Sequence, residues 1–215
     1  MKINTKKTKI IPFNPTKNFD FLPLLNFPGE DPLEVIYSTK LLGVTITSDL
    51  SWNEHVQNIS KQATKKLWIL VRFKALGGST DQLLKVYQTR VRSTLEFAAP
   101  VFYGGLTKAQ SRKLEAVQKK SFAIILGNEY NSYESALTTL KQEKLETRRE
   151  NLAYKFALKC ATSHRHKSMF KLNPQHRANM RNHKPFLEPK CSTSKYYNSP
   201  IPSLLRLLNK RGSMT

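Results

Sequence analysis

Acidic residues, which hold metal ions or move protons in many enzymes, are few in this sequence. The chain has 15 Asp and Glu among 215 residues. Phosphoryl transfer by two metal ions needs at least two carboxylates that converge on magnesium. The closest pair, Glu30-Asp31, lies in a loop between Pro28 and Pro32. The sequence has no glycine-rich phosphate loop, nucleophile elbow or H-E-x-x-H motif. We therefore interpret Glu30-Asp31 as a solvated turn and predict no catalytic residue.

Cysteine and histidine residues near the C-terminal end could in principle supply four zinc ligands. The set is Cys160, His164, His166, His176, His183 and Cys191. Its spacing matches no compact zinc finger or knuckle. We expect Cys160 to be a thiol in a helix core and the histidines to belong to a basic tail. No metal site is predicted, and zinc binding by the tail is left open as the alternative.

Positive charge is the strongest functional signal. With 36 Lys and Arg, the formal net charge is +21 and the isoelectric point is about 10.1. This exceeds what solubility requires, and self-repulsion in the folded state favours a polyanionic partner. We predict that RNA or DNA is this partner and that basic residues interleaved with aromatic ones bind it. The candidates are Lys7, Lys61, Lys65, Lys66, Arg72, Lys74, Arg90, Arg92, Arg112, Lys113, Lys119 and Lys120.

Charge and apolar patterns divide the chain into three regions. Residues 1–48 have short apolar runs broken by proline and glycine, including a β-branched run over 41–47, which predicts a small β-layer. Residues 49–160 have helical periodicity and predict a bundle. Residues 161–215 carry 11 basic side chains and 1 acidic one and predict a largely irregular basic tail. The predicted fold class is α+β.

Five helices are expected between residues 49 and 160. Three of them begin at recognisable signals, which are capping boxes at Ser51 and Thr107 and a start near Ser79. Two of them end at glycines, which are Gly77-Gly78 and Gly127. We expect the second helix to continue to Pro100. Two more helices span 132–140 and about 144–160, and the amphipathic segment 204–208 could dock on the bundle. The expected buried faces are Trp52, Val56, Ile59, Ala63, Leu67 and Leu70; Leu84, Tyr87, Val91 and Leu95; Leu114, Val117, Ser121 and Ile125; and Leu145, Leu152 and Phe156.

The cellular compartment follows from what the sequence lacks. Two cysteines cannot form a disulfide framework, and the N-terminus MKINTKKTK has no apolar signal core behind it. No apolar run approaches the roughly 18 residues of a membrane span. We expect an intracellular protein, nuclear or cytoplasmic, that is not secreted and does not enter a membrane.

Several segments occur in an order that resembles a known family. They are Asn4–Ile10 (NTKKTKI), Lys40–Ile46 (KLLGVTI), Leu50–Val56 (LSWNEHV), Val86–Ser93 (VYQTRVRS), Ala99–Gly104 (APVFYG) and Leu114–Lys120 (LEAVQKK). Together they resemble the C-terminal part of the reverse transcriptases of non-LTR (LINE-type, jockey-like) retrotransposons. The resemblance covers most of the chain to about residue 160, and the basic tail is similar to the C-terminus of the same reading frames.

The resemblance implies auxiliary roles for three parts of the chain. Lys7 would lie near the phosphates of the incoming nucleotide, Leu42 and Gly43 would form a primer grip, and the helices after Trp52 would be a thumb that clamps the template and primer. The family's metal-binding aspartates precede the segment that begins here at Asn4. We therefore expect a truncated, non-catalytic fragment without a cofactor, since magnesium would be needed only in a full-length parent enzyme. Its partners would be RNA, DNA or other parts of a retrotransposon ribonucleoprotein.

A second resemblance gives a different expectation. Residues 40–70 are similar to a helical module named after the N-terminus of an AlkB-homologue tRNA-modifying enzyme, which would imply methyltransferase or dioxygenase chemistry. An iron dioxygenase needs H-x-[DE], and no histidine here is followed two places on by an acid. We interpret this likeness as a shared local motif. A plain helical interaction protein whose charge serves a protein or ribonucleoprotein partner is the remaining alternative.

Overall fold

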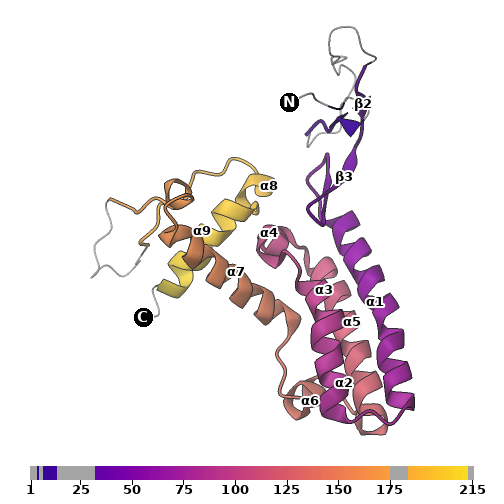
Figure 1. The fold of residues 1–215 in the computed structure, drawn as a ribbon. Coiled ribbons are helices and arrows are strands. Elements are labelled where there is room, and N and C mark those ends of the chain that lie inside the picture. Colours follow the sequence, from indigo (N-terminus) through magenta and orange to yellow (C-terminus); the bar gives the residue numbers. More distant parts are fainter. Residues whose placement is uncertain (1–3, 5–6, 14–31, 175–183, 213–215) are drawn as a thin grey trace. The chain divides into compact units, whose positions relative to one another are not determined.

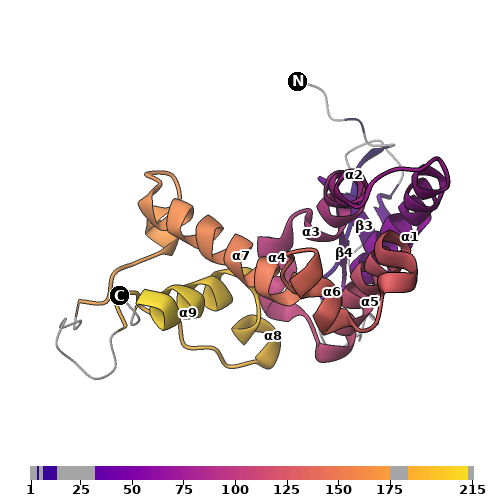
Figure 2. The ribbon, with the colours of Figure 1, turned by 90° about the horizontal axis from the view of Figure 1, so that it is seen from below.

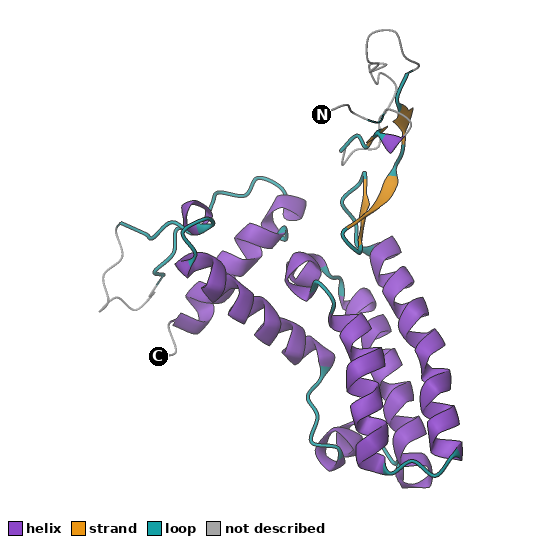
Figure 3. Ribbon diagram, in the orientation of Figure 1, coloured by secondary structure: helices purple, strands orange, loops and turns teal. Residues whose placement is uncertain are grey.

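The computed structural model describes residues 4, 7–13, 32–174 and 184–212. The chain divides into two compact units, residues 1–57 (the N-terminal unit) and residues 58–215 (the helical unit), and the division falls inside helix α1 (Asn53–Ala75). All described strands of the two sheets lie before α1, and helices dominate after it (Figures 1 and 3). The predicted α+β fold class is confirmed.

The N-terminal unit contains two small sheets. Strands β1 (Lys9–Ile10) and β2 (Glu34–Val35) pair in parallel, and β3 (Ser38–Leu41) and β4 (Val44–Thr47) form an antiparallel hairpin. Leu42 and Gly43 connect the hairpin with φ angles of 48° and 88°. Two consecutive positive φ angles match the tight turns that suit the twist of paired strands. The expected run over 41–47 is therefore the end of one strand, a turn and a second strand.

A buried histidine joins the hairpin to the start of α1. The Thr45 N–H donates a hydrogen bond of 3.2 Å to His55 Nδ1, and both residues are buried. The Trp52 ring meets the His55 ring edge-on, with 5.9 Å between centroids. Burial lowers the pKa of His55 from its ordinary value of 6.5. Since Nδ1 is an acceptor only in the neutral ring, this contact requires an uncharged histidine.

The helical unit contains the rest of α1 and the elements that follow it (Figures 1 and 2). They are α2 (Thr80–Val86), a π-helix η2 (Tyr87–Arg92), α3 (Ser93–Glu96), α4 (Ala99–Phe102), the 3₁₀ turn η3 (Tyr103–Gly105), α5 (Lys108–Leu126), the 3₁₀ turn η4 (Gly127–Glu129), α6 (Tyr133–Thr139), α7 (Leu145–Thr162), the 3₁₀ turn η5 (Lys167–Met169), α8 (Ser194–Tyr197) and α9 (Pro200–Gly212).

The segment α2–η2–α3 shows why a π-helix forms. Its fully buried residues are Leu83, Tyr87, Val91 and Leu95, each four positions after the last. In an α-helix each step of four turns a side chain about 40° beyond a full turn, so such a set would drift off the core. The wider π turn offsets this drift. The predicted face was wrong in one member, because Leu83 and not Leu84 is buried.

The end of this helix also differs from the prediction. We expected Pro100 to terminate it, but α3 ends at Glu96 and the chain turns at Ala98, whose φ is 54°. Pro100 instead lies in the first turn of α4, where its missing N–H removes no helical hydrogen bond.

The capping box at Thr107 forms as predicted, and the predicted helix start near Ser79 is a second capping box. Ser79 and Thr107 each accept a hydrogen bond from the backbone N–H three residues on, and the glutamine there bonds back to the cap N–H. The first helix differs, since it begins at Asn53 and the Ser51 N–H bonds to the side chains of Thr47 and Asp49. The predicted faces of α5 and of α1 from Val56 to Leu70 are buried.

The prediction for α7 was right for Leu145, which is fully buried, and wrong for Phe156, while Leu152 is half-buried. Phe156 is 46% exposed, whereas Arg149, Ala153, Ala157 and Cys160 are buried. Small residues on α7 leave room for α9, which contacts α7 and crosses it in Figure 1. A hydrophobic cluster fills the contact and confirms Cys160 as a core thiol. It consists of Ala153, Ala157, Cys160, Phe170, Leu204, Leu205, Leu207 and Leu208.

The C-terminal region is more ordered than the expected irregular tail, because α8 and α9 are regular helices and segment 204–208 docks as predicted. The docking requires a glycine at position 104. A Cβ there would lie 2.3 Å from the Cβ of Ser203 on α9 and 3.0 Å from the Asn198 carbonyl oxygen. His176 and His183 of the possible zinc set lie outside the described residues.

Candidate nucleic-acid interface

The outer face of α1 gathers three predicted basic residues around an exposed indole. Lys61, Lys65, Trp68 and Arg72 follow one another at spacings of 4, 3 and 4, which places them on one side of the helix. All four are exposed, and the Trp68 side chain is 63% exposed. From residue 58 to its end α1 contains no acidic residue. We call these four residues the α1 face.

Trp68 is the member that the sequence prediction missed. The sequence did contain a signal for it, because Trp68 does not belong to the predicted apolar stripe of α1 and therefore falls on the solvent-facing side of the helix. None of the four side chains makes a hydrogen bond, ion pair or ring contact with any residue that the structure describes. The α1 face therefore presents three free cations and a free ring surface.

Helix α5 carries four further predicted residues in two rows. Arg112 and Lys119 are seven positions apart, as are Lys113 and Lys120, so each pair lies on one side of the helix two turns apart. All four are exposed. Lys119 also places its ammonium 4.9 Å from the centroid of the Tyr133 ring.

Three predicted residues make contacts inside the helical unit. Lys74 Nζ donates to the carbonyl oxygens of Ile124 at 2.7 Å and Ile125 at 3.1 Å. Its positive charge is also stabilised there by the negative end of the α5 dipole. Lys66 Nζ donates to Thr94 Oγ1 at 2.6 Å. Arg92 Nη1 donates to Gln142 Oε1 at 2.8 Å. These side chains connect helices, and that use competes with nucleic-acid binding.

The remaining predicted residues lie on other elements. Arg90 is exposed on η2, and Lys7 is exposed in the N-terminal unit. Leu42 is 89% exposed at the tip of the hairpin, beside Gly43. An exposed leucine with positive φ stores backbone strain, which is more common at functional turns than elsewhere. The primer-grip role of Leu42 and Gly43 stays a prediction.

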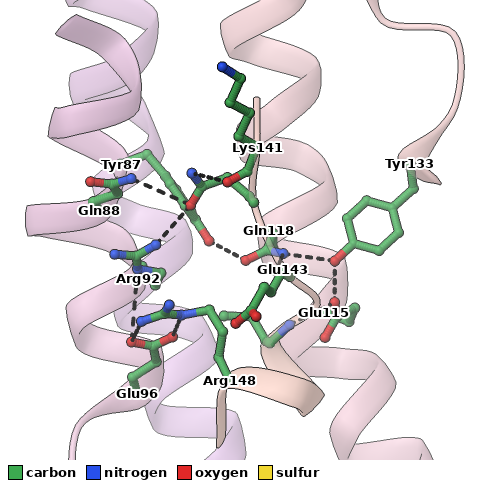
Figure 4. Close-up of polar contacts among 12 residues, drawn as sticks. Tyr87, Gln88, Arg92, Glu96, Glu115, Gln118, Tyr133, Lys141, Glu143 and Arg148 are labelled. Atoms are coloured by element: carbon green, nitrogen blue, oxygen red, sulfur yellow. Dashed lines mark hydrogen bonds and ion pairs between the residues drawn. The ribbon is translucent and has the colours of Figure 1, made fainter. Parts of the chain in front are cut away.

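A buried polar network holds the helices that carry these faces (Figure 4). The Tyr87 hydroxyl donates to Gln118 Oε1, and Gln118 Nε2 donates to the Tyr133 hydroxyl at 2.8 Å and to the Glu143 carbonyl at 2.9 Å. The Tyr133 hydroxyl in turn donates to Glu115. Gln118 and Tyr87 are almost completely buried. The network therefore fixes η2, α5, α6 and the loop before α7 to one another.

Three charged groups complete the network on the side of α3. Arg148 forms a two-pronged ion pair with Glu96, with Nη2 and Oε2 3.1 Å apart (Figure 4). Arg92 lies 3.9 Å from the same carboxylate. The hydrogen bond that Arg148 donates to Glu96 raises the pKa of Arg148 above its ordinary value.

The two tyrosines of this network act as hydrogen-bond donors in the structure. Burial raises the pKa of Tyr87 well above its ordinary value, and burial together with the hydrogen bond to Glu115 does the same for Tyr133. Both phenols therefore stay protonated at physiological pH. As permanent donors they satisfy Gln118 and Glu115, and they cannot accept a proton from a substrate.

Among residues 4, 7–13, 32–174 and 184–212, no three or more His, Cys, Asp or Glu side chains come together as a metal site. No helix in the same part of the chain has the length and apolarity needed to cross a membrane.

Comparisons with protein-family models, with curated proteins and with solved structures give no match to this chain.

Proposed function

We propose that the chain binds RNA or DNA without catalysing a reaction, and that the α1 face contacts an unpaired stretch of the strand. The observation that carries this proposal is the 63% exposed indole of Trp68 between Lys61, Lys65 and Arg72. Burying large apolar side chains is favourable, and an exposed tryptophan framed by cations is an unusual use of one. Such a surface is suited to a ligand that is both anionic and aromatic.

Each part of the α1 face has a separate physical role in this proposal. Lys61, Lys65 and Arg72 neutralise phosphates and release condensed counterions. Trp68 stacks on a base, which contributes about 1–3 kcal/mol per base in single-stranded complexes. Stacking requires an unpaired base, so the proposed ligand is single-stranded or has a loop or an end. The rows on α5 extend the positive surface that attracts the strand.

The reverse-transcriptase resemblance supports a passive role of this kind. A thumb holds the template and primer through the backbone while aspartates elsewhere perform the reaction. We propose that this chain is a fragment of that type, alone or as part of a retrotransposon ribonucleoprotein, and that it does not extend a primer by itself. Primer extension above a heat-inactivated control would contradict the non-catalytic part of the proposal.

Fluorescence of Trp68 tests the binding part directly. The chain has 2 tryptophans, so a Trp52→Phe variant leaves Trp68 as the reporter. Titration with a single-stranded oligonucleotide should quench its emission, because stacking on a base quenches an indole. The triple variant Lys61→Gln, Lys65→Gln, Arg72→Gln removes three phosphate contacts. The plot of log association constant against log salt concentration should become less steep, its negative slope shrinking in magnitude by about 2.

A matched variant separates a local interface from general charge. Lys155, Lys167 and Lys190 are exposed and lie outside the predicted set, so changing all three to Gln removes the same charge. This control should bind almost as the parent does. Equal losses in the two triple variants, or unchanged Trp68 emission at saturation, would refute the α1 face as the binding site. Quenching by anionic lipid vesicles but not by the oligonucleotide would refute nucleic acid as the ligand.

A further inference from the structure

A small cavity opens at the start of α5, away from the α1 face. Its volume is about 90 Å³, and it is lined by Tyr103, Leu106, Thr107, Lys108, Ser111, Glu146 and Arg149. Sites for drug-sized organic ligands are typically about 300–1,000 Å³. This cavity is therefore suited to an ion or a single small group and is too small for a nucleotide base.

Arg149 gives the cavity its chemistry. The residue is 2% exposed, its Nη2 donates to Ser111 Oγ at 2.6 Å, and its buried Nη1 has no hydrogen-bond partner among the described residues. Guanidinium keeps its charge in proteins, so burial leaves a cation whose donor is unsatisfied. Burial also lowers the pKa of Arg149, and the carboxylates of Glu115, Glu146 and Glu96 only oppose that effect from a distance.

The first turn of α5 adds positive potential at the same place. Thr107 is the N-cap and Lys108 the first residue of this 19-residue helix. The capping box satisfies the N–H groups of Thr107 and Gln110, which leaves those of Lys108 and Ala109 without a partner in the helix at the positive end of its dipole. A helix start, a lysine and a buried arginine beside one small cavity together favour an anion there.

Glu146 makes the arrangement selective. It lies in the first turn of α7 and lines the cavity beside the two cations. A fully deprotonated anion would be repelled by this carboxylate. An anion that retains a proton can donate it to Glu146 while another of its oxygens accepts from Lys108. A phosphate monoester, whose second pKa is near 6, retains such a proton in part near neutral pH, and inorganic phosphate retains at least one, whereas sulfate retains none.

We propose that this cavity is a binding site for a phosphate group that carries a proton, either inorganic phosphate or the terminal phosphate of a strand. Lys108 donates to one oxygen, the buried charge of Arg149 attracts the anion, and Glu146 accepts the proton of another oxygen. An internal phosphodiester has no proton to donate and is disfavoured. Binding of inorganic phosphate at this site does not depend on the α1 face.

Calorimetric titration of the full chain with inorganic phosphate and with sulfate, at pH 6.5 and matched ionic strength, tests the site. Phosphate should bind saturably and at least about tenfold more tightly than sulfate, since the carboxylate turns from a partner into a repulsive charge. Glu146→Gln should shrink this difference, because an amide can donate to sulfate. Lys108→Gln should weaken both anions about tenfold, and Arg149→Met should abolish saturable binding.

The exposed residues keep the test decisive even if the Arg149 variant does not fold. Lys61→Gln is the control and should change nothing. The proposal is overturned if phosphate does not bind saturably, if sulfate binds equally well, or if Glu146→Gln and Lys108→Gln match the parent protein. Oligonucleotides with a 5′-phosphate or a 5′-hydroxyl then identify the source. A preference for the phosphate that Lys108→Gln removes identifies a strand end, and no preference identifies free phosphate.

Discussion

Replacing Gln118 by methionine should destabilise the helical unit more than any other single change in the polar network. Gln118 is 1% exposed and makes three hydrogen bonds, to Tyr87, Tyr133 and the Glu143 carbonyl. Methionine has a similar length and shape but neither accepts the tyrosine proton well nor donates. The Tyr87 hydroxyl, which is fully buried, would therefore lose its acceptor without gaining water.

The size of the effect follows from which groups stay unsatisfied. An orphaned buried donor costs about 1–3 kcal/mol, and each neutral hydrogen bond contributes about 1 kcal/mol. The Tyr133 hydroxyl keeps its hydrogen bond to Glu115, so losing the contact between Tyr133 and Gln118 costs little stability. We expect Gln118→Met to lower the free energy of unfolding by about 2–4 kcal/mol and Tyr87→Phe by about 1–2 kcal/mol. The double variant should lose at least about 1 kcal/mol less than the sum, because it leaves no orphaned hydroxyl.

Urea denaturation followed by far-ultraviolet circular dichroism measures these values, with an unchanged m-value as the sign that only stability changed. Gln88→Met is the matched control. Gln88 is half-buried and its bond to Gln142 is 3.4 Å long, so water can replace that bond and the cost should stay below about 0.5 kcal/mol. A Gln118→Met value as small as this control, or a strictly additive double variant, would refute the network as a stabilising element.

Two further variants test other contacts between elements of the fold. Because burial lowers the pKa of His55, the unfolded state binds more protons than the folded state as the pH falls. The N-terminal unit should therefore keep its stability above about pH 6.5 and lose it as the pH falls below that value. His55→Gln should flatten this pH dependence, measured from Trp52 emission in a Trp68→Phe background. Gly104→Ala should lower the free energy of unfolding by about 1–3 kcal/mol through the clash with Ser203. Adding Ser203→Gly should partly restore the stability measured by thermal unfolding. No loss on Gly104→Ala would show that α9 does not dock as described.

Local signals were sufficient for much of the helical architecture. Capping residues and apolar periodicity act within a few positions, so the starts at Ser79 and Thr107 and the buried stripe from Val56 to Leu70 could be predicted. The predicted α1 cations Lys61, Lys65 and Arg72 are exposed for the same reason, since they occupy the side that the stripe leaves outside.

Errors arose where a partner distant in sequence decided the outcome. The spacing of four from Leu83 to Leu95 keeps these residues in the core only because the π-helix η2 forms, where Tyr87 contacts Gln118 and Phe122 of α5. Phe156 is the larger apolar residue on α7, yet the small Ala153 and Ala157 are inside, because α9 needs close approach there. A single-helix pattern contains neither fact.

The sequence by itself therefore determined the positive charge, the helix starts and the outward face of α1, because each depends on neighbours within two turns. Only the tertiary structure decided which cations stay free. It turned Lys74 toward the end of α5 and Lys66 toward Thr94, and it buried Arg149 beside the start of α5. Long side chains reach whichever acceptor the packing brings near, and that acceptor lies 28 to 51 residues away in sequence for the two lysines.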